Sequence, residues 1–236
     1  MKKLLIALLM APALVLASEG EFKLDKAPDR SGNPAALQNG AKLFVNYCLN
    51  CHSASYMRYN RLKDIGLTDK QIESNLMFTA DKVGELMRVA MQRQDAKVMF
   101  GVAPPDLTLI ARAKSSEMGS GPDWLYTYLR GFYRDDSRPT GWNNTLSPNV
   151  AMPHVLWELQ GEQVMGEEHE LKLEKKGTMS QEDYDAAVGD LVGFLTYMGE
   201  PVAGYRKSLG MLVLVGLVVL FSFAYALKKE YWKDVH

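Results

Sequence analysis

The chain of 236 residues has few cysteines and no excess of charge of either sign. Its two cysteines allow one disulfide at most, which excludes a disulfide-rich scaffold and a zinc site made only of cysteines. Its 27 basic and 28 acidic side chains leave a formal net charge of −1, so no basic surplus indicates a nucleic-acid-binding protein. The mean hydropathy of −0.16 excludes a polytopic membrane protein, although it permits a single spanning helix. Apolar residues make up 47% of the chain, which excludes a disordered protein.

The N-terminus has the pattern of a secretory signal peptide. Lys2 and Lys3 form a basic start, and an apolar run follows over Leu4–Leu16. The alternative is a membrane anchor, but this run is short for a helix that crosses a bilayer. We therefore predict that residues 1–17 are removed on export, by cleavage after Ala17.

Near the C-terminus, residues 208–227 form a run of twenty without a charge. At ~1.5 Å per residue such a helix is ~30 Å long, which matches the hydrocarbon core of a bilayer. A buried core helix is the alternative, but flanking basic and aromatic residues favour a membrane span. They are Tyr205, Arg206, Lys207, Lys228, Lys229, Tyr231, Trp232 and Lys233.

Together the two ends predict a single-pass topology in the inner membrane of a bacterial cell. The signal exports the chain, and the second hydrophobic segment stops its transfer. Residues 18–207 then form a periplasmic domain, residues 208–227 the transmembrane anchor, and residues 228–236 a cytoplasmic tail.

Helical periodicity dominates the exported part, so we predict a mainly α fold with one C-terminal transmembrane helix. Signals for a helix start occur at Asn33-Pro34, at Thr68 with Gln71, and at Ser180. The predicted helices cover residues 34–48, 69–77, 80–93 and 122–134, and a stretch from Ser180 to Glu200. Residues 135–153 are rich in Gly, Asn and Pro, which predicts a long loop, and long loops in compact domains are often functional.

Both cysteines lie in one motif, Cys48-Leu49-Asn50-Cys51-His52, whose C-x-x-C-H spacing is the attachment signature of c-type haem. Two thiols on one helical turn can each add to a haem vinyl group, and the histidine that follows can ligate the iron. A redox-active thiol pair, a small disulfide and a zinc site are the alternatives. The redox pair is disfavoured because Cys48 ends a predicted helix rather than starting one. The disulfide would close too small a loop to stabilise the fold much, and few further ligands exist for zinc. With the export signal, the motif predicts one covalent haem c with its iron.

Met152 is the favoured second axial ligand. It lies a hundred residues after His52, at the end of the turn-rich loop, and Pro153 biases it towards an extended backbone. A thioether ligand requires such a fixed strap, and it raises the reduction potential of a haem. The pattern leaves three rivals, which are His154, Met99 and Met165.

Several short blocks occur in an order that resembles the cytochrome c1 family, the haem-bearing subunits of ubiquinol–cytochrome c reductase (bc1) complexes, in its short bacterial form. After the haem motif the blocks are Pro104-Pro105-Asp106-Leu107, Gly131-Phe132-Tyr133, Pro139-Thr140-Gly141, Ala151-Met152-Pro153, Gly177-Thr178-Met179-Ser180 and Glu200-Pro201. The likeness covers about residues 35–230. The order of the blocks, together with the C-terminal anchor, makes it specific.

The resemblance implies a c-type cytochrome domain with axial ligation by His52 and Met152. It also implies a cofactor-binding role for Pro105 and for a basic residue that pairs with a haem propionate. Lys114 stands where arginine is usual in the family, and Arg112 lies two residues earlier, so both stay candidates for that pair. The implied partners are cytochrome b, a Rieske iron–sulfur protein as electron donor, and a cytochrome c as acceptor.

The predicted function is therefore one-electron relay in a respiratory chain, by a redox subunit that catalyses no reaction alone. A free-standing membrane cytochrome that feeds an oxidase is the first alternative. A haem peroxidase or gas-binding protein with an open sixth site is the second. The stretch 158–185 holds nine acidic residues against three lysines, which indicates either a solvated acidic loop or a surface that steers a basic carrier protein.

Overall fold

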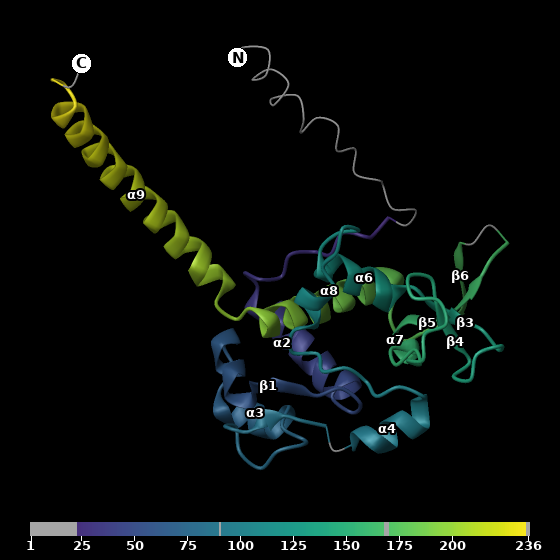
Figure 1. Ribbon diagram of the computed structural model, residues 1–236. Coiled ribbons are helices and arrows are strands. Elements are labelled where there is room, and N and C mark those ends of the chain that lie inside the picture. The colour runs from purple at the N-terminus through teal and green to yellow at the C-terminus, as the bar shows by residue number, and fades with distance from the viewer. Residues whose placement is uncertain (1–22, 90, 168–169, 235–236) are drawn as a thin grey trace.

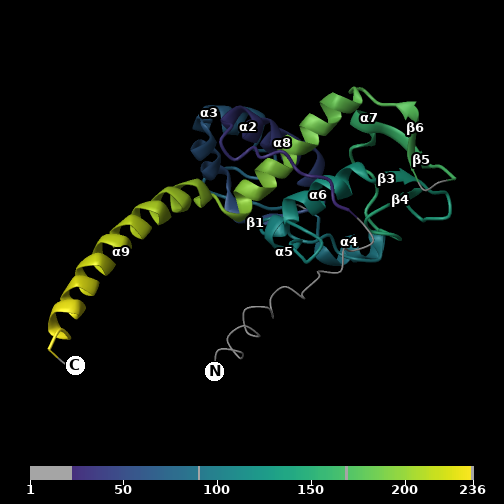
Figure 2. The same cartoon turned by 90° about the horizontal axis from the view of Figure 1, so that it is seen from above.

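The computed structural model describes residues 23–89, 91–167 and 170–234. The predicted signal peptide, residues 1–17, lies outside the described residues. About half of the protein is helical, which confirms the mainly α prediction. A head of short helices and hairpins carries one long helix that projects away from it, as Figures 1 and 2 show.

Two helices form the centre of the head: α2 (Pro34–Leu43) and α8 (Gln181–Gly199). They lie backbone to backbone, since a Cβ atom at Gly40 would collide with the carbonyl oxygen of Asp190. The other helices that pack on α8 are α5 (Ile110–Ala113), α6 (Gly121–Arg130) and α7 (Trp157–Gln160). The core of the head is therefore organised around α8.

The predicted helices at 34–48 and 69–77 are confirmed. The first is α2, which begins where the Asn33 side chain accepts a hydrogen bond from a backbone N–H, and which continues as a π-helical turn over Phe44–Cys48. π-Helical turns often occur at functional sites. The second is α3 (Asp69–Asn75), with the expected capping box at its start and a 3-10 helix, η3 (Tyr59–Ile65), before it.

Three two-stranded antiparallel sheets, which the sequence analysis does not predict, complete the described head. β1 (Ala54–Arg58) pairs with β2 (Leu86–Met87), β3 (Phe132–Arg134) with β4 (Trp142–Asn144), and β5 (Gly161–Met165) with β6 (Leu171–Lys176). Each strand is short, so the alternation of apolar and polar residues is too brief to stand out in the sequence.

The helix predicted at 80–93 is wrong. β2 lies inside that range, and the Glu85 carbonyl accepts a hydrogen bond from the Tyr59 N–H at 3.1 Å. Met87 is buried with no exposed surface, against β1. Backbone groups of this segment are therefore bonded to distant residues and are not available for a helix. The next described helix is α4 (Arg93–Phe100), which begins at the last residue of the predicted one.

The helix predicted at 122–134 ends early, because α6 stops at Arg130 and β3 follows directly. The predicted loop at 135–153 accordingly contains β4, the partner of β3. The described residues of the acidic stretch 158–185 mostly belong to regular elements: the end of α7, β5, β6 and the start of α8. Neighbouring basic side chains neutralise part of its charge: Glu162 pairs with Lys175 at 2.9 Å, and Asp185 pairs with Arg130 at 2.6 Å.

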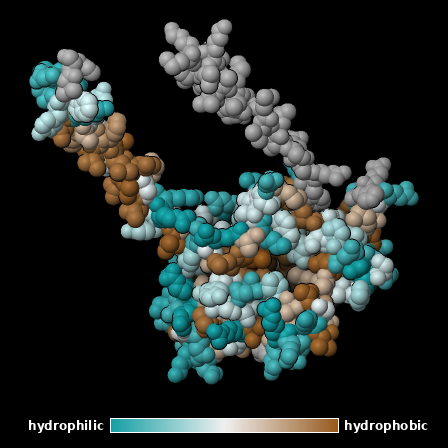
Figure 3. Space-filling model, viewed as in Figure 1, coloured by the Kyte–Doolittle hydropathy of each residue, from teal (hydrophilic) through white to brown (hydrophobic). Residues whose placement is uncertain are grey.

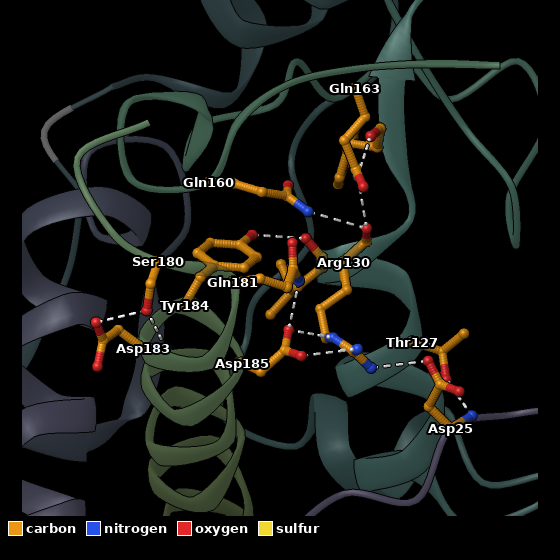
Figure 4. Close-up of polar contacts among 12 residues, drawn as sticks. Asp25, Thr127, Arg130, Gln160, Gln163, Ser180, Gln181, Asp183, Tyr184 and Asp185 are labelled. Atoms are coloured by element: carbon orange, nitrogen blue, oxygen red, sulfur yellow. Dashed lines mark hydrogen bonds and ion pairs between the residues drawn. The ribbon is translucent and has the colours of Figure 1, made fainter. Parts of the chain in front are cut away.

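The C-terminal end of α6 is held by side chains from other elements, as Figure 4 shows. The last carbonyl groups of a helix have no partner within it. Here the Tyr184 hydroxyl of α8 donates to the Leu129 carbonyl at 2.9 Å. The amides of Gln160 and Gln163 donate to the Arg130 carbonyl at 3.2 and 3.0 Å. α6 is therefore tied to α7, β5 and α8 at one point.

The helix predicted after Ser180 is confirmed as α8, and the predicted span at 208–227 lies within α9 (Ala203–Tyr231). Among the described residues, α9 is the one helix long and apolar enough to cross a membrane. Its apolar stretch is 0% buried by the head. Figure 3 shows this apolar surface between hydrophilic ends. The protein thus presents a membrane anchor at its C-terminal end.

The close contact between α2 and α8 predicts the effect of one substitution. Gly40→Ala should lower the free energy of unfolding by about 1–3 kcal/mol, because the added methyl group forces the two backbones apart. Urea unfolding measures the change. Gly84→Ala is the matched control, since a Cβ atom there meets nothing within 4 Å. Equal stability of the two variants would contradict the packing described for α2 and α8.

Candidate functional site

The C-x-x-C-H motif lies between the π-helical turn and β1. The N–H groups of Cys51 and His52 donate to the Cys48 carbonyl at 3.1 and 2.8 Å, so the motif forms one further helical turn. Cys48 is buried, Cys51 is partly exposed, and both are free thiols that line one cavity. Two sulfur atoms on a single turn of the chain therefore border the same space.

The His52 imidazole is oriented by one hydrogen bond. Its Nδ1 atom lies 2.7 Å from the Pro105 carbonyl oxygen, which can only accept, so Nδ1 carries the proton. Burial lowers the pKa of His52 below its usual value, which favours the neutral ring. The Nε2 atom thus keeps its lone pair for a metal, on a side chain that lines the cavity.

The loop that carries Pro105 is pinned to the chain just after the motif. The carboxylate of Asp106 accepts hydrogen bonds from the Ser55 N–H at 2.7 Å and from the Thr108 hydroxyl at 2.6 Å. Burial alone would raise the pKa of Asp106, but the hydrogen bonds outweigh it and lower that pKa. The charged Asp106 side chain therefore fixes the loop, and with it the carbonyl that orients His52.

The cavity encloses about 270 Å³, and its lining is almost entirely apolar. It lies where α6, α8, the motif and the end of the long loop meet. Besides the motif, the residues that line it include Ile110, Trp124, Leu125, Tyr128, Leu129, Val150, Ala151, Met152, Pro153, Leu191 and Leu195. An apolar cavity with a few polar groups is the usual form of a site for a large organic cofactor.

Met152 lines the cavity, a hundred residues away in sequence from His52, which also lines it. Its thioether sulfur accepts a hydrogen bond from the Tyr128 hydroxyl at 3.5 Å. Tyr128 in turn stacks on Trp124 at 4.9 Å between ring centroids. The structure therefore brings the predicted axial pair to one cavity, with α6 beside the thioether.

The rivals to Met152 lie elsewhere. His154 is only 2% exposed and stacks on Phe132 with ring centroids 4.9 Å apart, and burial lowers its pKa to about 4. It is not among the residues that line the cavity. Met99 is 67% exposed on α4, and Met165 ends β5. Neither methionine lines the cavity.

The two basic candidates for a propionate partner are separated by the fold. Arg112 is exposed and pairs with Glu200 at 3.1 Å, near the start of the membrane helix. Lys114 is half-buried and lines the cavity, with its ammonium 4.0 Å from the centre of the Trp124 ring. Of the two, only the lysine borders the space in which a haem would bind.

The surroundings of the two cysteines disfavour thiol–disulfide exchange. Burial raises the pKa of Cys48 to about 12, and burial also raises the pKa of Cys51. Thiol–disulfide exchange requires a thiolate, which these surroundings suppress. Within the described ranges, no group of three or more His, Cys, Asp and Glu side chains is arranged to hold a metal ion.

The cavity fits a covalent haem c. The two thiols border it from one helical turn, the His52 Nε2 atom is unprotonated, and the Met152 thioether faces the same space. The apolar lining suits the porphyrin ring, and the half-buried ammonium of Lys114 suits an ionised propionate. No residue in the lining adds a negative charge.

The sequence analysis missed Tyr128 and Asp106 as members of the site. Tyr128 was recognisable only as part of the apolar face of a helix, and that pattern does not distinguish a core residue from a cavity wall. Asp106 stands in a block that resembles the family, but its hydrogen bonds to the chain after the motif depend on the fold.

Comparison with known proteins identifies relatives over the full length of the chain. A sequence model of the Cytochrome C1 family matches residues 26–235. Cytochrome c1 of Allochromatium vinosum is 50% identical over 250 aligned positions that cover 100% of both chains. The ammonia monooxygenase gamma subunit of Nitrosomonas europaea is 50% identical over 100% of this chain and 98% of its own. Cytochrome c1 of Rhodospirillum rubrum is 27% identical over 84% of this chain and 81% of its own. The matched residues include the motif, the cavity and α9.

Proposed function

The chain belongs to the cytochrome c1 family, and from this premise we propose that it relays single electrons from a Rieske iron–sulfur protein to a cytochrome c within a quinol–cytochrome c reductase. The observation that carries the proposal is the cavity, since the groups that a methionine-ligated haem c needs all border it. They are Cys48, Cys51, His52 and Met152. The family implies a covalent haem c.

Haem c, when bound, supplies an iron that alternates between the ferric and ferrous states. Cys48 and Cys51 would hold the macrocycle by two thioether bonds, and His52 would ligate the iron through Nε2. The Pro105 carbonyl keeps that tautomer in place by accepting a hydrogen bond from the Nδ1–H group. Met152 would supply the second protein ligand to the iron, through its thioether sulfur. With two protein side chains as iron ligands, the site would suit electron relay better than peroxidase or gas-binding chemistry, which need a free ligand position on the iron.

We assign the propionate contact to Lys114 rather than to Arg112. Lys114 lines the cavity, whereas Arg112 is exposed and engaged with Glu200. A lysine offers a point charge in place of the two-pronged contact that arginine makes with a carboxylate. Lys114 would therefore place a positive charge beside the haem with little constraint on the orientation of the propionate.

The chain is a membrane-anchored protein, and we propose that its head is periplasmic. A signal peptide at 1–17 exports the chain and α9 stops its transfer, so residues 228–236 would lie in the cytoplasm. Cytochrome b and the Rieske protein are the proposed partners in the membrane. This orientation places the cavity on the side of the membrane where c-type haem is attached in bacteria.

Purification in a mild detergent tests the function. The chain should copurify with a cytochrome b and an iron–sulfur protein, and covalent haem should remain on it in a denaturing gel. The preparation should reduce a soluble cytochrome c when a quinol is added. Recovery of the chain alone, or with an oxidase, would favour the free-standing cytochrome. Recovery with an ammonia monooxygenase instead would assign the chain to the assembly named for its Nitrosomonas relative.

The axial ligand is tested by Met152→Leu. The haem should stay attached, the potential should fall by on the order of 100 mV, and carbon monoxide should bind the ferrous protein, because leucine cannot ligate iron. A redox titration and the carbon monoxide difference spectrum measure these effects. Met99→Leu, at an exposed site, is the control. An unchanged potential in Met152→Leu would place the ligand elsewhere.

Lys114→Met should lower the reduction potential of the haem by roughly 40 mV. For a one-electron couple this corresponds to a free energy on the order of 1 kcal/mol. The reason is that the lost positive charge no longer disfavours the ferric state. Arg112→Met should leave the potential close to that of the parent, since Arg112 points to Glu200. If the arginine variant shows the larger shift in a redox titration, the assignment of the propionate partner is reversed.

A further inference from the structure

The loop between β4 and Met152 is held by the side chains of two buried asparagines. The Asn144 Oδ1 atom accepts hydrogen bonds from the N–H groups of Leu146 and Ser147 at 3.0 and 3.1 Å. The Asn143 Oδ1 atom accepts one from the Asn149 N–H at 2.8 Å. The loop has no regular secondary structure, so these bonds set its backbone path.

The same two side chains fasten the loop to the rest of the head. The Asn144 Nδ2 atom donates to the Tyr128 carbonyl of α6 at 2.8 Å, and the Asn143 Nδ2 atom donates to Asp135 at 2.8 Å. Asn144 is 0% exposed and Asn143 is 7% exposed. A buried amide without partners destabilises a fold by about 1–3 kcal/mol, so both positions depend on these contacts.

Tyr128 connects the beginning of the loop to its end. Its carbonyl accepts the Asn144 bond, and its hydroxyl donates to the Met152 sulfur at 3.5 Å. Between these points, Asn149 adopts a left-handed backbone, with φ of 63°, and the Arg138 guanidinium donates to its side chain at 2.9 Å. Tyr128 of α6 is therefore hydrogen-bonded to both ends of the loop, to Asn144 at its start and to Met152 at its end.

We propose that Asn143 and Asn144 are positioning residues for the axial thioether, which hold the loop so that the Met152 sulfur remains within bonding reach of the iron. A methionine side chain has three rotatable bonds, so its sulfur keeps one position only where the backbone that carries it is fixed. The inference rests on the proposed function, because it requires Met152 to be the ligand. It adds that the asparagine pair sets how firmly that ligand is held.

The test uses the full chain in its membrane complex. Asn144→Leu keeps the branched shape of the side chain and makes none of the three hydrogen bonds. Asn144→Ser keeps one oxygen acceptor and forms such turns more weakly. Haem should stay attached in both. The potential should fall in the order parent, serine, leucine, and the fraction of ferrous protein that binds carbon monoxide should rise in the same order. Asn143→Leu should shift both readouts in the same direction.

Asn75→Leu is the matched control, because Asn75 is exposed and bonds only a carbonyl of its own helix, at 2.9 Å from Gln71. It should leave both readouts at the parental value. Parental potentials and no carbon monoxide binding in haem-containing Asn144 and Asn143 variants would overturn the inference. Loss of haem in Asn144→Ser as well as in Asn144→Leu would show a general folding role and would also overturn it.

Met152→Leu separates the two possible failures. If Met152→Leu lowers the potential while the asparagine variants do not, the proposed ligand stands and only the positioning role fails. If Met152→Leu leaves the potential unchanged, the ligand assignment itself is wrong, and the positioning role falls with it.

Discussion

The C-terminal end of α6 must be hydrogen-bonded from outside, and this constraint organises the head. A helix leaves its last carbonyl groups without partners, and buried carbonyl groups without partners are strongly unfavourable. In this protein α6 ends inside the head, so other elements must supply the donors. The donors are the hydroxyl of Tyr184 in α8 and the side-chain amides of Gln160 in α7, Gln163 in β5 and Asn144 in β4. Four elements therefore meet where one helix stops.

That junction also shapes the cavity. α6 presents an apolar and aromatic face to the cavity, while its end holds the loop that leads to Met152. On another side, the Asp106 loop is fastened to the chain after the motif and carries the carbonyl that orients His52. Each of the two proposed ligand side chains is thus supported by its own polar contacts, beside a cavity that is otherwise apolar. A rigid arrangement of this kind suits a haem that transfers electrons without a change of ligands.

Local signals predicted the elements whose stability is local. The Thr68 capping box lies within the segment that forms α3, and the apolar periodicity of α8 lies within α8 itself. Both helices form as expected. The helix predicted at 80–93 does not form, and the one predicted at 122–134 ends early as α6. The reason is that β2 and β3 exchange backbone hydrogen bonds with residues elsewhere in the chain. A strand of two or three residues leaves almost no pattern of its own, and only its partner makes it a strand.

By itself, the sequence determined the haem attachment motif, the apolar segment that becomes α9, and the family to which the chain belongs. Each of these depends on contiguous residues or on their order, which folding does not change. Tertiary structure alone decided that Met152, and none of its rivals, lines the cavity, and that Lys114 rather than Arg112 borders it. Tertiary structure also placed the Asn144 side chain between α6 and the loop that leads to Met152. Such placements depend on hydrogen bonds and packing between segments far apart in the chain, which no local pattern of residues encodes.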